Sequence, residues 1–301
     1  MLDTGSDYPR SEYLVETSWL EEHLNDADLR IFDCTVEILP NPDPVKNKKF
    51  PFVFKSARDQ FDLQHIPNAG FIDIPGELSD VSVDIPLMMP PAEQLTEVMS
   101  KHGIQENSCV VLYSSAEANW AARVWWMLRA VGFENVAILN GGSKKWCDEG
   151  RQMSSEPCTY AKSEFKADLK EGAFVTKSEV SATLNKDETC LISALPEPIH
   201  TGTSDVAFGR KGCIPGSVNI PFMNMHNPET GAYLPIEQLK ELFSQLDIEQ
   251  ADKIISYCGG GVAAANIAFV LTLLGYKNVA VYDGSMLEWG NDLSLPMEVM
   301  G

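Results

Sequence analysis

Residues 254–289 read IISYCGGGVAAANIAFVLTLLGYKNVAVYDGSMLEW. A short apolar run, a glycine loop, a stretch of small and apolar residues and a second apolar run follow one another. This is the order of a buried strand, a helix and a second strand. Gly275 stands where a left-handed residue commonly ends a helix. Because strand–helix–strand connections are right-handed, the stretch predicts an α/β fold with a parallel sheet flanked by helices.

The same pattern occurs earlier in the chain. Residues 109–146 read CVVLYSSAEANWAARVWWMLRAVGFENVAILNGGSKKW, again with two apolar runs around a helical stretch. Upstream, QHIPNAGFIDIP at 64–75 is echoed by GCIPGSVNIPF at 212–222. Three pairs of residues fall at matching places: Tyr113 and Tyr257, Gly132 and Gly275, Trp146 and Trp289. Since both echoes keep the same order, we infer that a whole domain has been duplicated.

The chain of 301 residues is long enough for two domains that each bury a core. Between the two copies, residues 148–170 are polar, contain a proline and show no apolar periodicity. Such a composition indicates a linker on the surface. We predict an N-terminal domain over 1–152, a linker over 153–166 and a C-terminal domain over 167–301.

The composition limits the partners of the protein. Its formal net charge of −20 repels nucleic acids and anionic membrane surfaces. No apolar run is long enough to span a bilayer, and the first residues show no signal-peptide pattern, so we expect a cytoplasmic protein. The seven cysteines stand singly, without a C-x-x-C pair, which argues against a zinc site or a disulfide framework. We expect neither a metal nor an organic cofactor.

The glycine loop allows two interpretations. Gly259, Gly261 and Ala264 fit the G-x-G-x-x-A pattern of a dinucleotide site, and Asp283 follows at a spacing that suits a ribose contact. The matching loop of the first copy, SSAEANWAA, contains no glycine, however. The fold therefore does not depend on a diphosphate-binding turn, and we favour the second interpretation, in which the loop carries a reactive cysteine.

Cys258 stands at the mouth of this loop. A run of small residues lets successive backbone N–H groups point inward and bind an anion, and the helix that follows adds the positive end of its dipole. Such surroundings favour a thiolate nucleophile. A cysteine phosphatase is excluded, because its loop needs an arginine and none follows before Tyr276. Besides the catalytic Cys258, five loop residues are predicted to bind the substrate: Gly259, Gly260, Gly261, Val262 and Ala263.

Together these motifs resemble the rhodanese superfamily, specifically the two-domain thiosulfate and mercaptopyruvate sulfurtransferases. The resemblance lies in the H-I-P or C-I-P turn, RVWWMLRAVGF, LNGGSKKW and VYDGSMLEW. It implies two tandem rhodanese-like domains, of which the first is inert and the second carries the nucleophile. Cys258 matches that nucleophile, and Ser114 or Ser115 is its counterpart in the first copy. The cysteine of this family takes sulfane sulfur from a donor, becomes a persulfide and passes the sulfur to a thiol or cyanide.

The chain departs from the family pattern where the donor is chosen. Thiosulfate-type loops resemble C-R-K-G-V-T and mercaptopyruvate-type loops resemble C-G-S-G-V-T, whereas Gly259, Gly260 and Ala263 carry neither charges nor hydroxyls. Pro75 and Leu87 stand where the mercaptopyruvate type has an acid and a histidine. The family segment L-D-x-R reads LISAL here.

The resemblance also suggests where a substrate anion binds. Family members hold the carboxylate or sulfonate with arginines upstream of the G-H-I-P-G turn, and Arg210 precedes that turn here. We therefore predict a small anionic donor, with 3-mercaptopyruvate favoured over thiosulfate. Arg123 is expected to pair with an acid at the domain interface, and Trp120 to be a packing residue. The alternative function is a non-enzymatic sulfur carrier or partner-binding module with the same fold.

Overall fold

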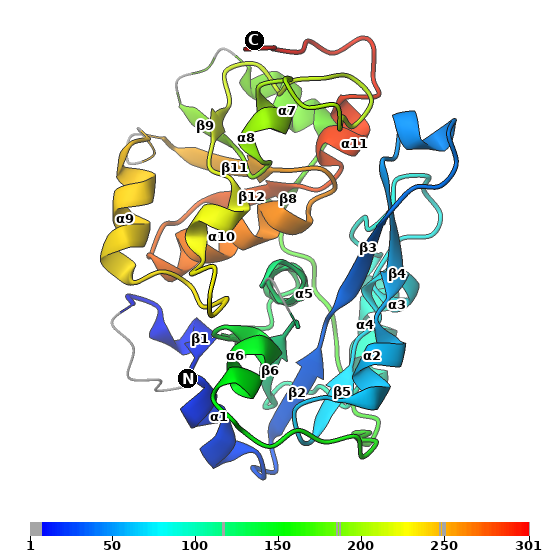
Figure 1. The fold of residues 1–301 in the computed structure, drawn as a ribbon, viewed down its shortest axis with the longest axis vertical. Coiled ribbons are helices and arrows are strands. Elements are labelled where there is room, and N and C mark those ends of the chain that lie inside the picture. The colour runs from blue at the N-terminus through cyan, green and yellow to red at the C-terminus, as the bar shows by residue number, and fades with distance from the viewer. Residues whose placement is uncertain are drawn as a thin grey trace.

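The structure, a computed structural model, describes residues 8–115, 118–184, 186, 188–246, 248 and 251–300. Among these residues, two sheets have five strands each, and all strand pairs within these two sheets are parallel. The first sheet has the order β1-β7-β6-β2-β5 and the second, read from its far edge, β8-β12-β11-β9-β10 (Figure 1). The two orders correspond strand by strand. The predicted fold of two tandem parallel α/β domains is confirmed.

The elements of the first domain lie within residues 11–148. Its strands are β1 (Leu14–Val15), β2 (Leu29–Asp33), β3 (Val36–Pro40), β4 (Phe52–Ser56), β5 (Ala69–Phe71), β6 (Cys109–Tyr113) and β7 (Val136–Leu139). Its helices are α1 (Thr17–His23), α2 (Arg58–Leu63), α3 (Ile74–Glu77), α4 (Ala92–Lys101), α5 (Asn119–Ala130) and α6 (Gly142–Asp148). Two short 3-10 helices are η1 (Ser11–Tyr13) and η2 (Lys46–Lys48).

The second domain repeats this order over residues 174–289. Its strands are β8 (Phe174–Val175), β9 (Thr189–Ser193), β10 (Val218–Asn219), β11 (Lys253–Tyr257) and β12 (Val279–Tyr282). Its helices are α7 (Lys177–Thr183), α8 (Glu197–His200), the 3-10 helix η3 (Phe222–Met225), α9 (Ile236–Ser244), α10 (Val262–Leu273) and α11 (Ser285–Trp289).

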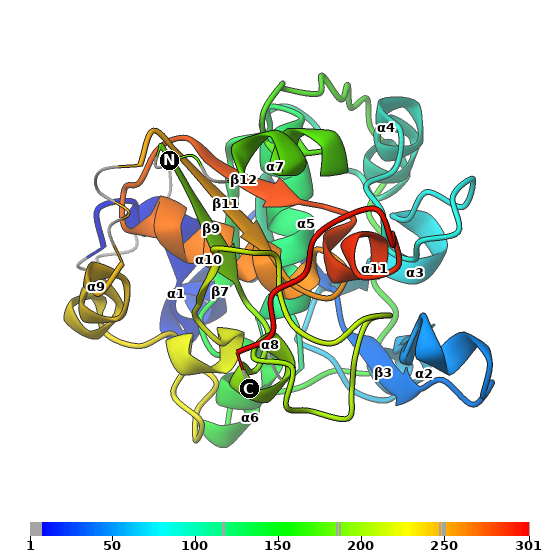
Figure 2. The same ribbon diagram turned by 90° about the horizontal axis from the view of Figure 1, so that it is seen from above.

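Helices α5 and α10 pack against each other between the two sheets and join the domains (Figures 1 and 2). Both helices are buried along nearly their whole length, and most of their residues are apolar or small; the exceptions are Asn119, Arg123 and Arg129 of α5 and Asn266 and Thr272 of α10. Trp125 of α5 meets Phe269 of α10 edge to face, with ring centroids 4.9 Å apart. The sites at the ends of these helices are therefore shared by both domains.

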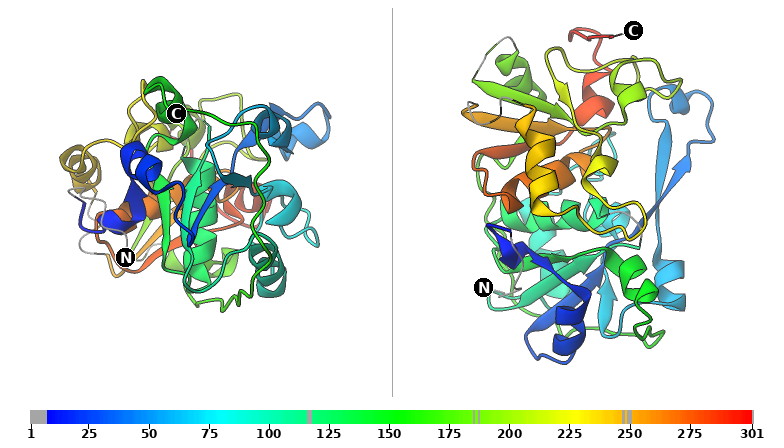
Figure 3. Two further views of the ribbon diagram at one scale, coloured as in Figure 1. Left: turned by 90° about the horizontal axis from the view of Figure 1, so that it is seen from below. Right: turned by 60° about the vertical axis from the view of Figure 1, so that its left-hand side comes forward.

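An antiparallel hairpin of β3 and β4 has no counterpart in the second domain. It leaves the first sheet and runs alongside the second domain, as Figure 1 and the right-hand view of Figure 3 show. Near its tip the carbonyl of Lys49 accepts a hydrogen bond of 3.3 Å from Asn291 Nδ2. The hairpin places Phe52 and Phe54 close to the second domain, and the sequence did not predict it.

The connection between the domains follows the surface of the first domain. Ser154 exchanges two backbone hydrogen bonds of 2.8 Å with His65, and the Tyr160 hydroxyl donates to the Asn68 carbonyl at 2.7 Å. No regular element occurs between α6 and β8. Within the described ranges, no helix is long and apolar enough to cross a membrane.

Candidate active site

Cys258 lies directly after strand β11, in the loop that leads into helix α10. This is the carboxyl edge of the second sheet, the edge where parallel α/β folds gather their functional loops. The cysteine is only 3% exposed, and its surface lines a cavity between the domains. Gly261 caps helix α10 with a φ of +76°, a left-handed conformation that glycine adopts without strain.

Helix α11 holds the backbone of the cysteine loop. The carbonyls of Cys258 and Gly259 accept hydrogen bonds from the N–H groups of Met286 and Leu287, at 3.1 and 2.8 Å. Since the N–H and C=O of one peptide unit point in opposite directions, the N–H groups of Gly259 and Gly260 point away from α11. No hydrogen bond among the described residues uses these two N–H groups. These two N–H groups are therefore available to an anion, as in the nests that successive backbone N–H groups form.

Ser285, the first residue of α11, also holds the cysteine loop, and the sequence did not predict this role. Its Oγ accepts hydrogen bonds from the N–H groups of Cys258 and Gly261, at 3.1 and 3.2 Å, and donates to the Tyr282 carbonyl at 2.7 Å. Ser285 has a φ of +46°, which is unfavourable for a residue with a side chain. Its counterpart in the first domain is Gly142, with a φ of +58°. The replacement of this glycine by serine in the second copy is the feature of the sequence that could have pointed to Ser285.

A buried ion pair supports the loop from the side of the first domain. Arg123 Nη1 of α5 lies 2.6 Å from Oδ1 of Asp283, which follows β12. Arg123 also donates to the Leu87 carbonyl at 2.6 Å, and Asp283 Oδ2 accepts from the Met89 N–H at 2.7 Å. A Cβ atom on Gly261 would lie 2.9 Å from Asp283. The expected pairing of Arg123 with an acid at the domain interface is confirmed.

The cavity at Cys258 has a volume of about 240 Å³. Gly259, Gly260, Val262 and Ala263 line it, as predicted for the substrate site, whereas Gly261 does not. The first domain contributes Ile38, Phe52, Phe54, Leu87, Asn119 and Trp120. The second domain adds Phe208, Phe222 and a group of aliphatic residues. Among the described residues that line the cavity, none is charged.

Asn119 is the polar side chain on the wall of this cavity, and a buried network orients it. Asn266 Nδ2 donates to Asn119 Oδ1 at 2.8 Å and to His226 Nε2 at 2.9 Å, while the Tyr233 hydroxyl donates to Asn266 Oδ1 at 2.7 Å. Burial lowers the pKa of His226 to about 4. The imidazole is therefore neutral at physiological pH, and its Nε2 is free to accept this bond.

Arg210 does not reach the cavity. Its guanidinium donates to four backbone carbonyls at the end of α11 and beyond, with distances between 2.6 and 3.1 Å. The acceptors are Gly290, Leu295, Trp289 and Asp292. Only one of its five N–H bonds is left over. The predicted bidentate contact between Arg210 and a substrate carboxylate is therefore wrong.

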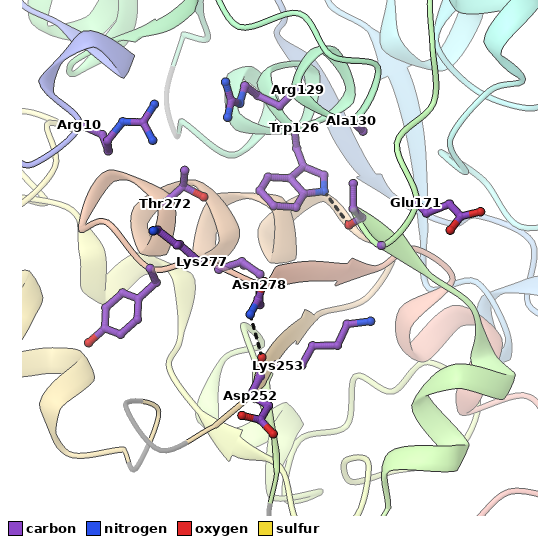
Figure 4. A pocket seen from close by; sticks show the side chains of 14 residues that line it. Arg10, Trp126, Arg129, Ala130, Glu171, Asp252, Lys253, Thr272, Lys277 and Asn278 are labelled. Atoms are coloured by element: carbon purple, nitrogen blue, oxygen red, sulfur yellow. Dashed lines mark hydrogen bonds between the residues drawn. The ribbon is translucent and has the colours of Figure 1, made fainter.

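A second cavity, of about 570 Å³, lies at the amino-terminal edge of the second sheet, near the starts of β11 and β12 (Figure 4). Four cationic side chains border it: Arg10, Arg129, Lys253 and Lys277. Arg10 and Arg129 both lie over the ring of Tyr13, at 4.5 and 4.8 Å from its centroid. No cysteine lines this cavity among the described residues, so it lies apart from the reactive loop. Groups of His, Cys, Asp and Glu that could hold a metal ion do not occur in the described part of the chain.

Comparisons with known proteins agree with this arrangement. The family model of the rhodanese-like domain matches residues 16–149 and again residues 178–292. Thiosulfate sulfurtransferase of Gallus gallus is 31% identical over 282 residues, which cover 92% of each chain. The 3-mercaptopyruvate sulfurtransferase of Escherichia coli K12 is 28% identical over 288 residues, or 95% of this chain and 98% of that protein. The crystal structure of SseA from Escherichia coli matches with a TM-score of 0.75 at 27% identity, over 91% of this chain and 98% of that one.

Two like parallel α/β domains, of which only the second has a cysteine in the loop that follows its central strand, define a tandem-domain protein with one candidate reactive loop. The chain belongs to the rhodanese family. The relatives that match it along nearly their whole length are sulfurtransferases, and the chain is an enzyme of this class.

Proposed function

We propose that Cys258 accepts sulfane sulfur from a donor and delivers it to a thiol or cyanide. The observation that carries this proposal is the loop geometry, in which the thiol lines the cavity beside the N–H groups of Gly259 and Gly260. The Cys258 thiolate attacks the outer sulfur of the donor, an S–S bond forms, and the donor residue leaves with the electron pair of the broken bond. The acceptor then attacks the outer sulfur of the persulfide and releases the thiolate. No net oxidation occurs over the cycle.

The nest supports the persulfide between the two steps. A persulfide anion at Cys258 presents its outer sulfur where backbone N–H groups converge, and the N-terminus of α10 adds a favourable dipole. The Ser285 Oγ accepts hydrogen bonds from two N–H groups of the loop, and two N–H groups of α11 donate to loop carbonyls, so the loop backbone is held in place. Because the groups are fixed before sulfur arrives, they need no rearrangement during transfer.

The predicted preference for 3-mercaptopyruvate over thiosulfate has lost its support from Arg210. It now rests on charge alone. The monoanion 3-mercaptopyruvate brings one unpaired negative charge into the cavity, whereas the dianion thiosulfate brings two, and each unpaired charge is costly to bury. Relatives of the chain bear the names of both activities, and an Arabidopsis thaliana relative is named as a mitochondrial enzyme. The cytoplasmic location stays a prediction.

Mass spectrometry of the protein and of its proteolytic peptides tests the proposal. Incubation with a sulfane donor should add one sulfur to the peptide that contains Cys258, and a reducing thiol should remove it. Cys258→Ser should abolish both the addition and the turnover with cyanide. Cys213→Ser, at another buried cysteine of the same domain that does not line the cavity, should retain both. Persulfide formation without turnover would instead support the sulfur-carrier alternative, and labelling at another cysteine would refute the proposal.

A further inference from the structure

We infer that the sulfur donor of this enzyme carries an apolar group about the size of an aromatic ring, next to a sulfane sulfur with a single negative charge. The inference rests on the proposed persulfide chemistry at Cys258 and names the substrate class of that site. Its basis is the composition of the cavity, which differs from what a small dianion such as thiosulfate requires.

Aromatic side chains form the walls of the cavity on both sides. Phe52 and Phe54 come from strand β4 of the hairpin, and Phe208 and Phe222 come from the second domain. Phe54 lies edge to face with Trp120, with centroids 6.0 Å apart, and the centroids of Phe52 and Phe208 are 6.2 Å apart. The hairpin thus closes an aromatic lining over the cysteine loop. Such a lining gains free energy when it removes an apolar ligand from water.

No cation serves the cavity. The described residues that line it carry no charge, and the nearby Arg123 is already paired with Asp283 and bonded to the Leu87 carbonyl. Leu195, which ends the segment LISAL, lines the cavity as a buried aliphatic residue. A dianion would lose its hydration here and gain only backbone N–H donors in return.

The absence of charge is built into the packing of the loop. An added Cβ on Gly259 would lie 2.6 Å from the ring of Phe208, which is closer than real side chains approach. Arg210 fixes the backbone just after Phe208 to the end of α11. Both its guanidinium and its backbone N–H donate to the Gly290 carbonyl, the backbone bond at 3.2 Å. A longer side chain therefore cannot extend from residue 259 while Phe208 keeps its place.

The volume of the cavity has room for a donor of this size. An apolar cavity of roughly 150 Å³ holds a benzene ring, so about 240 Å³ admits a ring together with a small sulfur-bearing group. An organic thiosulfonate or hydropersulfide has this form. Its charged terminal sulfur meets the N–H groups of the loop, and its apolar group meets the aromatic walls. On transfer, the bond between the terminal sulfur and the rest of the donor breaks, and a sulfinate or thiolate leaves with the electron pair.

Steady-state kinetics with three donors test the inference, with cyanide as the acceptor. Benzenethiosulfonate should exceed methanethiosulfonate in kcat/KM by roughly 10-fold or more, because it buries several additional carbon atoms. Both should exceed thiosulfate. Phe54→Ala should reduce the ratio of benzenethiosulfonate to methanethiosulfonate roughly 10-fold. Leu39→Ala, on the same hairpin but outside the cavity lining, should leave the ratio unchanged.

A charge-introducing variant supplies the converse test. Leu195→Arg should raise kcat/KM for thiosulfate and lower it for benzenethiosulfonate, with folding checked by thermal melting. Thiosulfate equal to or better than benzenethiosulfonate in the wild type, or an unchanged donor ratio in Phe54→Ala, would overturn the inference while the persulfide at Cys258 still forms. Failure of Cys258 to gain sulfur from any of the three donors would instead refute the proposed function.

Discussion

Replacing Ser285 should disable the cysteine loop without touching the cysteine. The Ser285 Oγ accepts the N–H groups of Cys258 and Gly261, and Ser285 is fully buried. Ser285→Ala leaves two buried donors without an acceptor, at a cost of about 1–3 kcal/mol for each. The free energy of unfolding should therefore fall by about 2–6 kcal/mol. Because the nest loses its support, the rate of sulfur transfer should fall roughly 10-fold or more.

Ser285→Gly separates the hydrogen bonds from the strained backbone. Glycine removes the same acceptor but adopts the left-handed conformation freely, which recovers about 1–2 kcal/mol. Its greater freedom in the unfolded chain costs about 0.5–1 kcal/mol. Ser285→Gly should thus be more stable than Ser285→Ala by up to about 1.5 kcal/mol, with a similar loss of rate.

Calorimetry and the initial rate of sulfur transfer to cyanide measure the two effects. Ser217→Ala is the matched control, since the Ser217 Oγ is buried in the same domain and bonds to the Ile214 carbonyl and the Tyr257 hydroxyl at 2.6 Å each, but makes no hydrogen bond to residues 258–261 within the described chain. It should lose stability but keep the transfer rate. Transfer by Ser285→Ala within twofold of the wild type would refute the role assigned to Ser285. A glycine variant less stable than the alanine variant would refute the argument from backbone strain.

Three further predictions concern the surroundings of the loop. Arg210→Ala should lower the free energy of unfolding by about 2–4 kcal/mol and raise KM for all donors alike, with or without a carboxylate. Arg210→Lys should not restore the stability, because lysine lacks the planar guanidinium that donates to several carbonyls at once. Gly259→Arg should abolish transfer, and adding Phe208→Ala should recover about 1–3 kcal/mol of stability as a positive coupling in a double-mutant cycle. His226→Asn should flatten the rise of stability with pH between about pH 4 and 6.5 by up to about 1.4 kcal/mol per pH unit, measured by denaturation across that range. The sign follows because the lowered pKa of His226 leaves the folded protein unprotonated where the unfolded protein binds a proton.

Much of the fold followed from the sequence because the two copies obey one pattern. Each strand is a short apolar run and each crossover helix is small or apolar, so periodicity and order sufficed to predict two parallel sheets. The position of Cys258 followed from the strand, glycine loop and helix around it. Arg123 was predicted to pair at the interface since a buried guanidinium needs a partner, and Asp283 is that partner.

The rest of the site depended on contacts between segments far apart in the chain. The strands of the hairpin read VEILP and FVFKS, and nothing in these residues shows that the hairpin reaches the second domain. The predicted contact between Arg210 and the substrate was wrong because its guanidinium donates to carbonyls at the end of α11 and just beyond it. These carbonyls lie about 80 residues later in the chain. Trp120 was expected to pack only, yet it lines the cavity, because the hairpin brings Phe54 against it.

The first domain lines the cavity at Cys258 although its own loop carries no cysteine. At the position that corresponds to Ser285, a Cβ on Gly142 would clash with the Ser114 carbonyl, so a side chain does not fit there while the backbone keeps its place. The same domain nevertheless supplies the hairpin phenylalanines, Trp120 and Asn119 to the cavity. In the function proposed for Cys258, the second copy carries the chemistry and the first forms a wall of the donor site, so we expect the choice of donor to depend on residues that lie up to about 200 positions before the cysteine.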